Sequence, residues 1–361
     1  MSARLCFVAA PLIARSGVYN STIELVTTAR ARGLDWTAVV GVSRTAGGTA
    51  STAPGVREFE IEPSGLLGVR ALSRHLRSLP EFSDADLVVT MVPQSDMALA
   101  LTRRAWVAYL RGLPWPAVGE SSPLKRRAWQ AIERMALRRA REVWATTRVL
   151  ATETGSDVDR LVPPGLVPPE SPAPEPGSRV RDIVWAARFS EDKNPSLFLD
   201  ALTGLDAQGA MYGTGPLEEQ VRQHAPSNVD VRGWRAREAI WHSARAYAGT
   251  SNREAFGRSA VEAAMLGIPV ILSDVFGCAD MLYTDPSLRS ALVLDTSDVG
   301  LWREAISRLT SDDEFHARAS AHLQANASLL TIDSAVDNVV AASDDVIRGR
   351  SDARSRPEAP H

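Results

Sequence analysis

Short apolar runs of strand-like composition alternate with helical patterns along nearly the whole chain, and one proline-rich segment interrupts the alternation. The segment 161–178 holds seven prolines, so neither a helix nor a central strand can form there. The pattern therefore predicts two doubly wound α/β domains, each a parallel sheet covered by helices, with a stiff connector between them. The strand candidates are 5–12, 36–42, 86–92, 105–110 and 142–146 before the connector, and 182–189, 210–212, 229–232, 246–250, 269–273 and 292–294 after it.

The proline-rich segment sets the predicted domain boundaries. Residues 1–160 are expected to form an N-terminal Rossmann-like domain, 161–178 a linker, and 179–332 a C-terminal Rossmann-like domain. A helix at 333–348 is expected to pack back toward the N-terminal domain, and the polar tail 349–361 to be disordered. Doubly wound sheets bind ligands beyond the carboxyl ends of their strands, so we expect an interdomain cleft between two facing domains.

Charge and cysteine content exclude several functional classes. The net charge of the 361 residues is only -3, but residues 1–160 carry a net charge of +6 and the remainder -9. This asymmetry argues against a uniformly basic nucleic-acid binder and indicates an anionic partner for the first half. Two distant cysteines give no disulfide framework or zinc site, and no apolar run reaches the roughly 18 residues of a spanning helix, so a cytoplasmic protein is expected.

Two glutamates in the second half suggest a ligand with hydroxyls at both ends. Glu254 and Glu262 flank the start of a predicted helix at Gly257, whose backbone N–H groups and positive dipole favour an anion such as phosphate. Carboxylates accept hydrogen bonds from hydroxyls, so a nucleoside diphosphate sugar matches the layout. The alternative is a loop glutamate and a solvated helix glutamate with no ligand.

Two cations precede this segment. Arg188 follows a predicted strand and Lys193 stands at the next helix start, so both can reach a diphosphate and neutralise its charge without a metal. Only two of the 40 basic residues are lysines, Lys125 and Lys193, which suggests that a compact ammonium is required at position 193. The alternative is an exposed lysine with no such role.

The ordered segments RFSEDKN, YGTGP, VRGW and REAFGRSAVEAAMLGIPVILSD resemble the retaining glycosyltransferases of family four, which have the GT-B fold. The resemblance covers most of residues 4–348, and its E-x7-E signature runs from Glu254 to Glu262. It implies that Arg188 and Lys193 hold the donor diphosphate, Glu254 the donor sugar and Glu262 the ribose. The resemblance further implies donor-binding positions at Gly17, Gly213, Gly233, Trp234, Phe256, Gly257, Arg258 and Ser259.

The first half departs from the family pattern at one important position. Family members often place a histidine on the fourth-strand segment, where this chain has Arg111 in YLRG. Acceptor-side residues are expected at Ser16, Arg111 and Lys125. The segment 121–144 reads as a basic amphipathic helix whose stripe comprises Trp129, Ile132, Met135, Ala136 and Ala140. Such a helix either rests peripherally on an anionic membrane or packs its stripe on the sheet.

The expected function is a retaining hexosyltransferase that moves a sugar from a nucleoside diphosphate to an acceptor hydroxyl. No metal or cofactor is expected, because the histidines lack metal-ligand spacing. The acceptor is open among saccharide, lipid-linked, protein and small-metabolite classes, and nucleic acid is not expected. Two alternatives remain: a sugar-nucleotide epimerase or hydrolase on the same fold, and a non-catalytic GT-B binding subunit.

Overall fold

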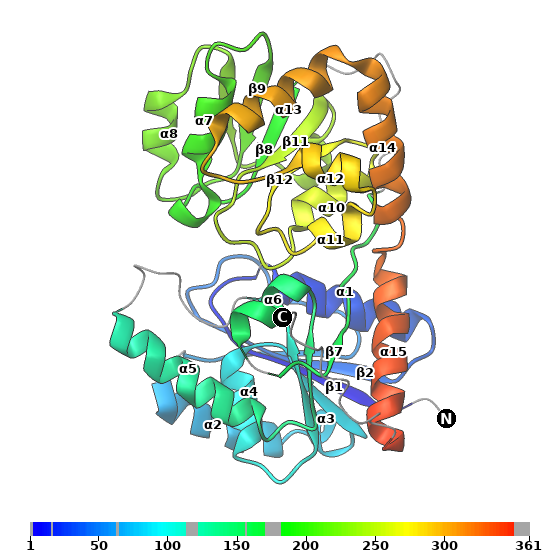
Figure 1. The fold of residues 1–361 in the computed structure, drawn as a ribbon. Coiled ribbons are helices and arrows are strands. Elements are labelled where there is room, and N and C mark those ends of the chain that lie inside the picture. The colour runs from blue at the N-terminus through cyan, green and yellow to red at the C-terminus, as the bar shows by residue number, and fades with distance from the viewer. Residues whose placement is uncertain are drawn as a thin grey trace, which may run out of the picture. The chain divides into compact units, whose positions relative to one another are not determined.

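The computed structural model describes residues 3–15, 17–62, 65–112, 122–155, 157–169 and 182–349, apart from the side chains of residues 237 and 238. Residues 170–178, the second half of the expected linker, and the expected disordered tail beyond residue 349 lie outside these ranges. The chain divides into two compact units (Figure 1). Unit 1 comprises the chain up to Gly165 and from Ile332 onward, and unit 2 comprises Leu166–Thr331.

Seven parallel strands form the sheet that the structure describes in unit 1, in the order β3-β2-β1-β4-β5-β6-β7. The direction of strand succession reverses between β1 and β4, which makes this the topological switch point of the sheet. The strands are β1 (Leu5–Leu12), β2 (Trp36–Val42), β3 (Val56–Glu60), β4 (Leu87–Thr90), β5 (Trp106–Leu110), β6 (Glu142–Ala145) and β7 (Arg160–Leu161).

Helices cover both faces of this sheet. Along β1, Leu5 and Phe7 enter one core while Cys6 and Val8 enter the other, as the two-residue period of a strand requires. The helices of unit 1 are α1 (Val18–Ala31), α2 (Gly65–Arg77), α3 (Pro80–Ser83), α4 (Pro93–Ala100), α5 (Pro123–Leu137), α6 (Arg148–Thr154) and α15 (Ile332–Arg348). The last of these, α15, packs beside α1 (Figure 1).

A polar pair interrupts the core between α4 and α5. Asp96 and Glu133 are each only 2% exposed, and the hydroxyl of Thr90 donates to Asp96. Burial raises the pKa of both carboxyls, and the proximity of Asp96 raises that of Glu133 further. At neutral pH the pair therefore favours a protonated state.

Six parallel strands form the described sheet of unit 2, in the order β10-β9-β8-β11-β12-β13, with its switch point between β8 and β11. The strands are β8 (Asp182–Ala186), β9 (Gln208–Tyr212), β10 (Val229–Gly233), β11 (Ala244–Gly249), β12 (Val270–Ser273) and β13 (Val293–Leu294). The helical elements are η1 (Glu191–Lys193), α7 (Pro195–Leu202), α8 (Glu218–His224), α9 (Arg237–Ile240), α10 (Arg258–Met265), α11 (Ala279–Leu282), α12 (Pro286–Leu292), α13 (Val299–Ser311) and α14 (Asp313–Ala327). One hydrophobic core holds these elements together.

The predicted α/β class with two doubly wound parallel sheets is confirmed. Every predicted strand has a counterpart, whereas β3 and β7 were not predicted. β3 lies at the sheet edge and carries Arg57, Glu58 and Glu60, so it lacks the apolar run that identifies a buried parallel strand. No helix in the described ranges combines the length and the apolar character that crossing a membrane requires.

Candidate functional site

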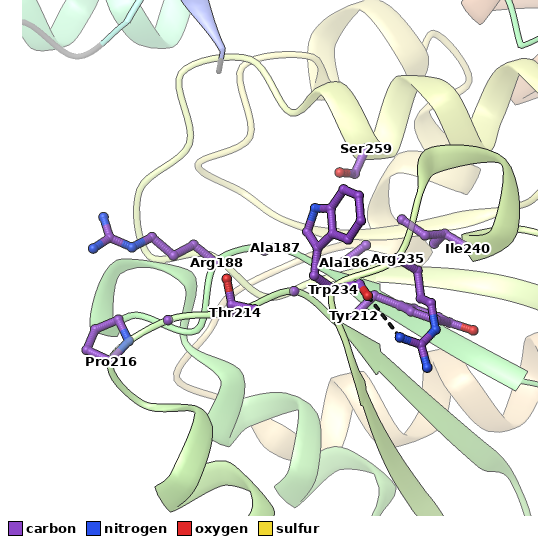
Figure 2. A pocket seen from close by; sticks show the side chains of 12 residues that line it. Ala186, Ala187, Arg188, Tyr212, Thr214, Pro216, Trp234, Arg235, Ile240 and Ser259 are labelled. Atoms are coloured by element: carbon purple, nitrogen blue, oxygen red, sulfur yellow. Dashed lines mark hydrogen bonds between the residues drawn. The ribbon is translucent and has the colours of Figure 1, made fainter. Parts of the chain in front are cut away.

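A pocket of about 620 Å³ opens at the carboxyl ends of β8, β9 and β10 in unit 2 (Figure 2). This end of the sheet is where ligands bind in open α/β folds, and β8 borders the switch point. The pocket is lined by Ala186, Ala187, Arg188, Tyr212, Gly213, Thr214, Gly215, Pro216, Trp234, Arg235, Ile240 and Ser259.

Two glycines allow the loop after β9 to run against the loop after β8. A Cβ atom on Gly213, which has a φ of +136°, would lie 1.9 Å from the carbonyl oxygen of Ala187. A Cβ atom on Gly215 would lie 2.4 Å from the carbonyl oxygen of Phe189. The Phe189 amide donates to the Thr214 carbonyl at 3.0 Å, so the two loops form one continuous pocket wall.

The charged groups of the pocket are cationic. Arg188 is exposed, and its guanidinium has no hydrogen-bond or ion-pair partner in the described part of the chain. Arg235 donates to the carbonyl oxygen of Trp234 at 3.0 Å (Figure 2). Among the described residues no carboxylate lines this pocket, so it favours an anionic ligand.

Trp234 gives the pocket a large aromatic surface. Its side chain is 68% exposed, and Figure 2 shows the indole pointing toward Ser259 at the start of α10. A large indole left in solvent beside a pocket offers a flat face for a ring-shaped ligand group.

The structure brings Lys193 and Glu254 together. The Lys193 ammonium lies 2.8 Å from Glu254 Oε2 and donates to the carbonyl oxygen of Arg253 at 3.3 Å. Both side chains are partly buried, and neither lines the pocket. The lysine charge is therefore matched by a carboxylate at this position rather than left open to solvent.

Hydrogen bonds between two loops hold this ion pair in place. The Trp185 indole donates to the hydroxyl of Thr250 at 2.9 Å. That hydroxyl in turn lies 3.1 Å from the carbonyl oxygen of Lys193. The Asn252 amide donates to the carbonyl oxygen of Asp192 at 2.8 Å, so the loop after β8 is fixed against the loop after β11.

Gly257 is the N-cap residue of α10; it has a φ of +101°, and no side chain caps this end of the helix. A Cβ atom there would lie 2.6 Å from the ring of Phe276, so both the conformation and the packing require glycine. Phe256 is buried before the cap, whereas Ser259 reaches the pocket wall. Glu262, one turn along the helix from Arg258, is 8% exposed and is therefore not a solvated helix residue.

The remaining predicted donor residues occupy two different places. Gly233 ends β10, and its carbonyl oxygen accepts from the Gly213 amide at 3.0 Å next to the pocket. Gly17 belongs to unit 1, where it caps α1 with a φ of +44°. The described residues that line the pocket all belong to unit 2.

The acceptor-side residues all belong to unit 1. Ser16 lies outside the described residues. Arg111 follows β5, and its guanidinium carbon lies 4.9 Å from the centre of the Tyr109 ring, a cation–π contact. Lys125 is exposed on α5 and lines a separate pocket of unit 1.

Most of the apolar stripe on α5 packs inside the protein. Ala136 is buried, and Trp129 and Ile132 pack partly buried against the core of unit 1. The predicted helix 121–144 is too long, because α5 ends at Leu137 and Ala140 packs against the same core from beyond its end. Met135 is the exception at 59% exposed. This packing is the one expected of an ordinary domain helix, and it leaves mainly charged side chains on the outer surface of α5.

Several residues of functional interest were not predicted from the sequence, in the unit 2 pocket and in unit 1. Tyr212, Thr214, Arg235 and Ile240 line the unit 2 pocket. The first three lie at or just after predicted strand ends, which could have indicated them, whereas Ile240 belongs to α9 and carries no such signal. In unit 1, Glu58 accepts from Arg15 at 2.5 Å and from the Tyr19 hydroxyl at 2.7 Å, two residues that stand on either side of Gly17 in the sequence.

The same contacts determine the charge of Glu58. Burial, the largest single effect, raises the pKa of this carboxyl, but the hydrogen bonds from Arg15 and Tyr19 together hold it below its ordinary value.

Among the described residues no three histidine, cysteine or acidic side chains cluster as metal ligands would.

Comparison with known proteins points to the same part of the chain, unit 2. Residues 180–312 match the family model described as Glycosyl transferases group 1. No curated protein matches the chain. Sucrose-phosphate synthase from Thermosynechococcus elongatus is 16% identical, with a TM-score of 0.75 over 96% of this chain and 100% of that one.

Two further solved structures have a similar fold over nearly the whole chain. HepE of Anabaena, solved in complex with UDP and glucose, is 16% identical with a TM-score of 0.72 over 95% of this chain and 100% of that one. WaaG, a glycosyltransferase involved in lipopolysaccharide biosynthesis, is 16% identical with a TM-score of 0.67 over 96% of this chain and 100% of that one. The chain therefore has the GT-B fold of glycosyltransferases, and most of its unit 2 matches the family of glycosyl transferases group 1.

Proposed function

We propose that this protein is a retaining glycosyltransferase of family four. It transfers a hexose-type sugar from a nucleoside diphosphate sugar to an acceptor hydroxyl without a metal. The observation that carries the proposal is the pocket at the carboxyl edge of unit 2, lined by Arg188 and Arg235 and, among the described residues, by no carboxylate. HepE, a protein of similar fold, was solved with UDP and glucose.

In this proposal the donor occupies unit 2. Its diphosphate lies between Arg188 and the N-terminus of α10, its base lies against Trp234, and its ribose is bound by Glu262. Lys193 and Glu254 form an ion pair before the donor arrives. Glu254 then accepts from hydroxyls of the donor sugar while Lys193 turns its charge toward the diphosphate.

The proposed reaction exchanges one bond for another on a single face of the sugar. The bond from the anomeric carbon to the diphosphate oxygen breaks, and a bond from that carbon to the acceptor oxygen forms. The acceptor proton passes to the leaving diphosphate, so no protein nucleophile takes part. Arg188 and Lys193 stabilise the charge that develops on the leaving group.

The acceptor is proposed to bind through unit 1, with Ser16, Arg111 and Lys125 on the acceptor side. The protein is proposed to work in the cytoplasm, and any peripheral contact with an anionic membrane would depend on the basic side chains of α5, because its stripe packs inward. Binding to vesicles of anionic lipid that disappears at high salt would support such contact.

Calorimetric titration with UDP, GDP, ADP and TDP, with and without EDTA, tests the donor site. One diphosphate should bind saturably and independently of metal. Arg188→Ala should weaken it by about 10- to 100-fold, the contribution of a charge-assisted hydrogen bond. Arg289→Ala is the control, because Arg289 pairs with Asp280 and does not line the pocket. If no diphosphate binds, or if both variants bind like the parent, the donor assignment is wrong.

A further inference from the structure

A second pocket, of about 270 Å³, lies within unit 1. Pro11 comes from the end of β1, Ile61 follows β3, and Gln94 belongs to the first turn of α4 directly after β4. The pocket is therefore at the carboxyl edge of the unit 1 sheet, beside the switch point between β1 and β4. Ligands of open α/β sheets bind at this position.

Three polar side chains line this pocket without partners. In the described part of the chain, Glu62, Gln94 and Lys125 make no side-chain hydrogen bond or ion pair. Together they supply a carboxylate that accepts, an ammonium that donates, and an amide that does both. Their net charge is zero.

Apolar groups form the rest of the wall. Trp129 on α5 is half-buried, and Val69 and Leu72 on α2 are buried behind the pocket. Gly65 and Gly68 are three residues apart on α2, so the same face of this helix presents no side chain at two positions. A flat aromatic side chain beside a few unpartnered polar groups is typical of a small-molecule site.

The two pockets differ in the ligands that they favour. The unit 2 pocket is large and cationic, whereas the unit 1 pocket is less than half its volume and carries balanced charges. Balanced donors and acceptors suit a neutral ligand whose hydroxyls both donate and accept, and the volume suits a single sugar ring. A diphosphate would meet the carboxylate of Glu62.

We propose that the unit 1 pocket binds a pyranoside, hydrogen-bonded by Glu62, Gln94 and Lys125 and stacked on Trp129, and that this pyranoside is the sugar acceptor. The acceptor is thus a saccharide. The acceptor role of this pyranoside rests on the proposed transferase function, whereas its binding to the unit 1 pocket does not.

Saturation-transfer NMR on the full chain tests the binding directly. The probes are methyl glucoside, galactoside, mannoside and N-acetylglucosaminide at millimolar concentration, with glycine and serine as zwitterionic competitors. At least one glycoside should receive saturation on its ring protons. Gly68→Leu should abolish that signal, because a leucine side chain at this position fills the pocket, and leucine is a better helix former than glycine.

Arg70→Leu is the matched control, since it adds a leucine to an exposed position of the same helix outside the pocket and should retain the signal. Gln94→Ala should weaken binding through the loss of an amide partner. The proposal is overturned if no glycoside gives a signal, if Gly68→Leu retains it, or if only the amino acids bind. Titration of Gly68→Leu with the nucleoside diphosphates separates this failure from failure of the donor site, because that pocket lies in unit 2.

Discussion

Replacement of Gly213 by alanine should destabilise unit 2 through two separate effects. The φ of +136° is a conformation that side chains rarely adopt, and adopting it costs about 1–3 kcal/mol. The new Cβ would also lie 1.9 Å from the carbonyl oxygen of Ala187, and such overpacking costs a further 1–3 kcal/mol, approximately. The neighbouring backbone cannot simply withdraw, because the Ala187 amide donates to the Tyr212 carbonyl at 3.1 Å and the Gly213 amide to Gly233 at 3.0 Å.

Gly204 provides a matched control within the same unit. Its φ is +74°, but the nearest atom to a new Cβ is the end of the Arg303 side chain, 4.0 Å away. Gly204→Ala therefore carries the conformational effect without the backbone clash. The Gly213 variant should lose about 1–3 kcal/mol more than the Gly204 variant.

Hydrogen exchange of amides in β8 and β9 at increasing urea concentration measures the free energy of opening in this unit alone, which avoids assuming that both units unfold together. The Gly213 variant should also bind the nucleoside diphosphate more weakly, because the shifted carbonyl belongs to the pocket wall. Equal losses in the two variants would refute the argument that close backbone approach requires glycine at position 213.

Two further predictions concern Lys193 and Glu133. Lys193→Arg should lower turnover by about 100- to 1000-fold with little change in melting temperature, because a planar guanidinium replaces the compact ammonium near the leaving group; turnover close to that of the parent would contradict this. Glu133→Gln should stabilise unit 1 at neutral pH. Because the pKa of Glu133 is raised, protonation stabilises the fold below the ordinary value of 4.5, and this contribution is lost as pH rises, by at most about 1.4 kcal/mol per pH unit. The gain from the variant should accordingly be larger at pH 8 than at pH 5 in urea unfolding, and an equal gain at both would contradict the assignment.

The strands of both sheets could be predicted wherever burial on two faces makes the sequence continuously apolar. Val270–Ser273 and Trp106–Leu110 are such strands. β3 was missed because an edge strand pairs on one side and can carry charges, as Arg57 and Glu58 show. Its pairing with β2 depends on tertiary structure, which a local pattern does not contain.

The candidate site was only partly predictable for a similar reason. Arg188, Gly213, Trp234 and Ser259 each follow a strand end or begin a helix, and all four line the unit 2 pocket. Arg235 was not distinguished, because it stands among several other arginines and its position depends on the turn after β10.

The ion pair of Lys193 with Glu254 gives a structural reason for the presence of lysine at position 193. The pair exists because Thr250 accepts from Trp185 and its hydroxyl lies close to the loop that carries Lys193, and no sequence pattern contains that contact. At this position a single ammonium reaches one carboxylate oxygen and one carbonyl oxygen on the same loop. A guanidinium presents donors in a wider planar fork and would displace one of these contacts. The choice of lysine at 193 in a chain that otherwise uses arginine at all but one of its basic positions is therefore explained by the space between two loops.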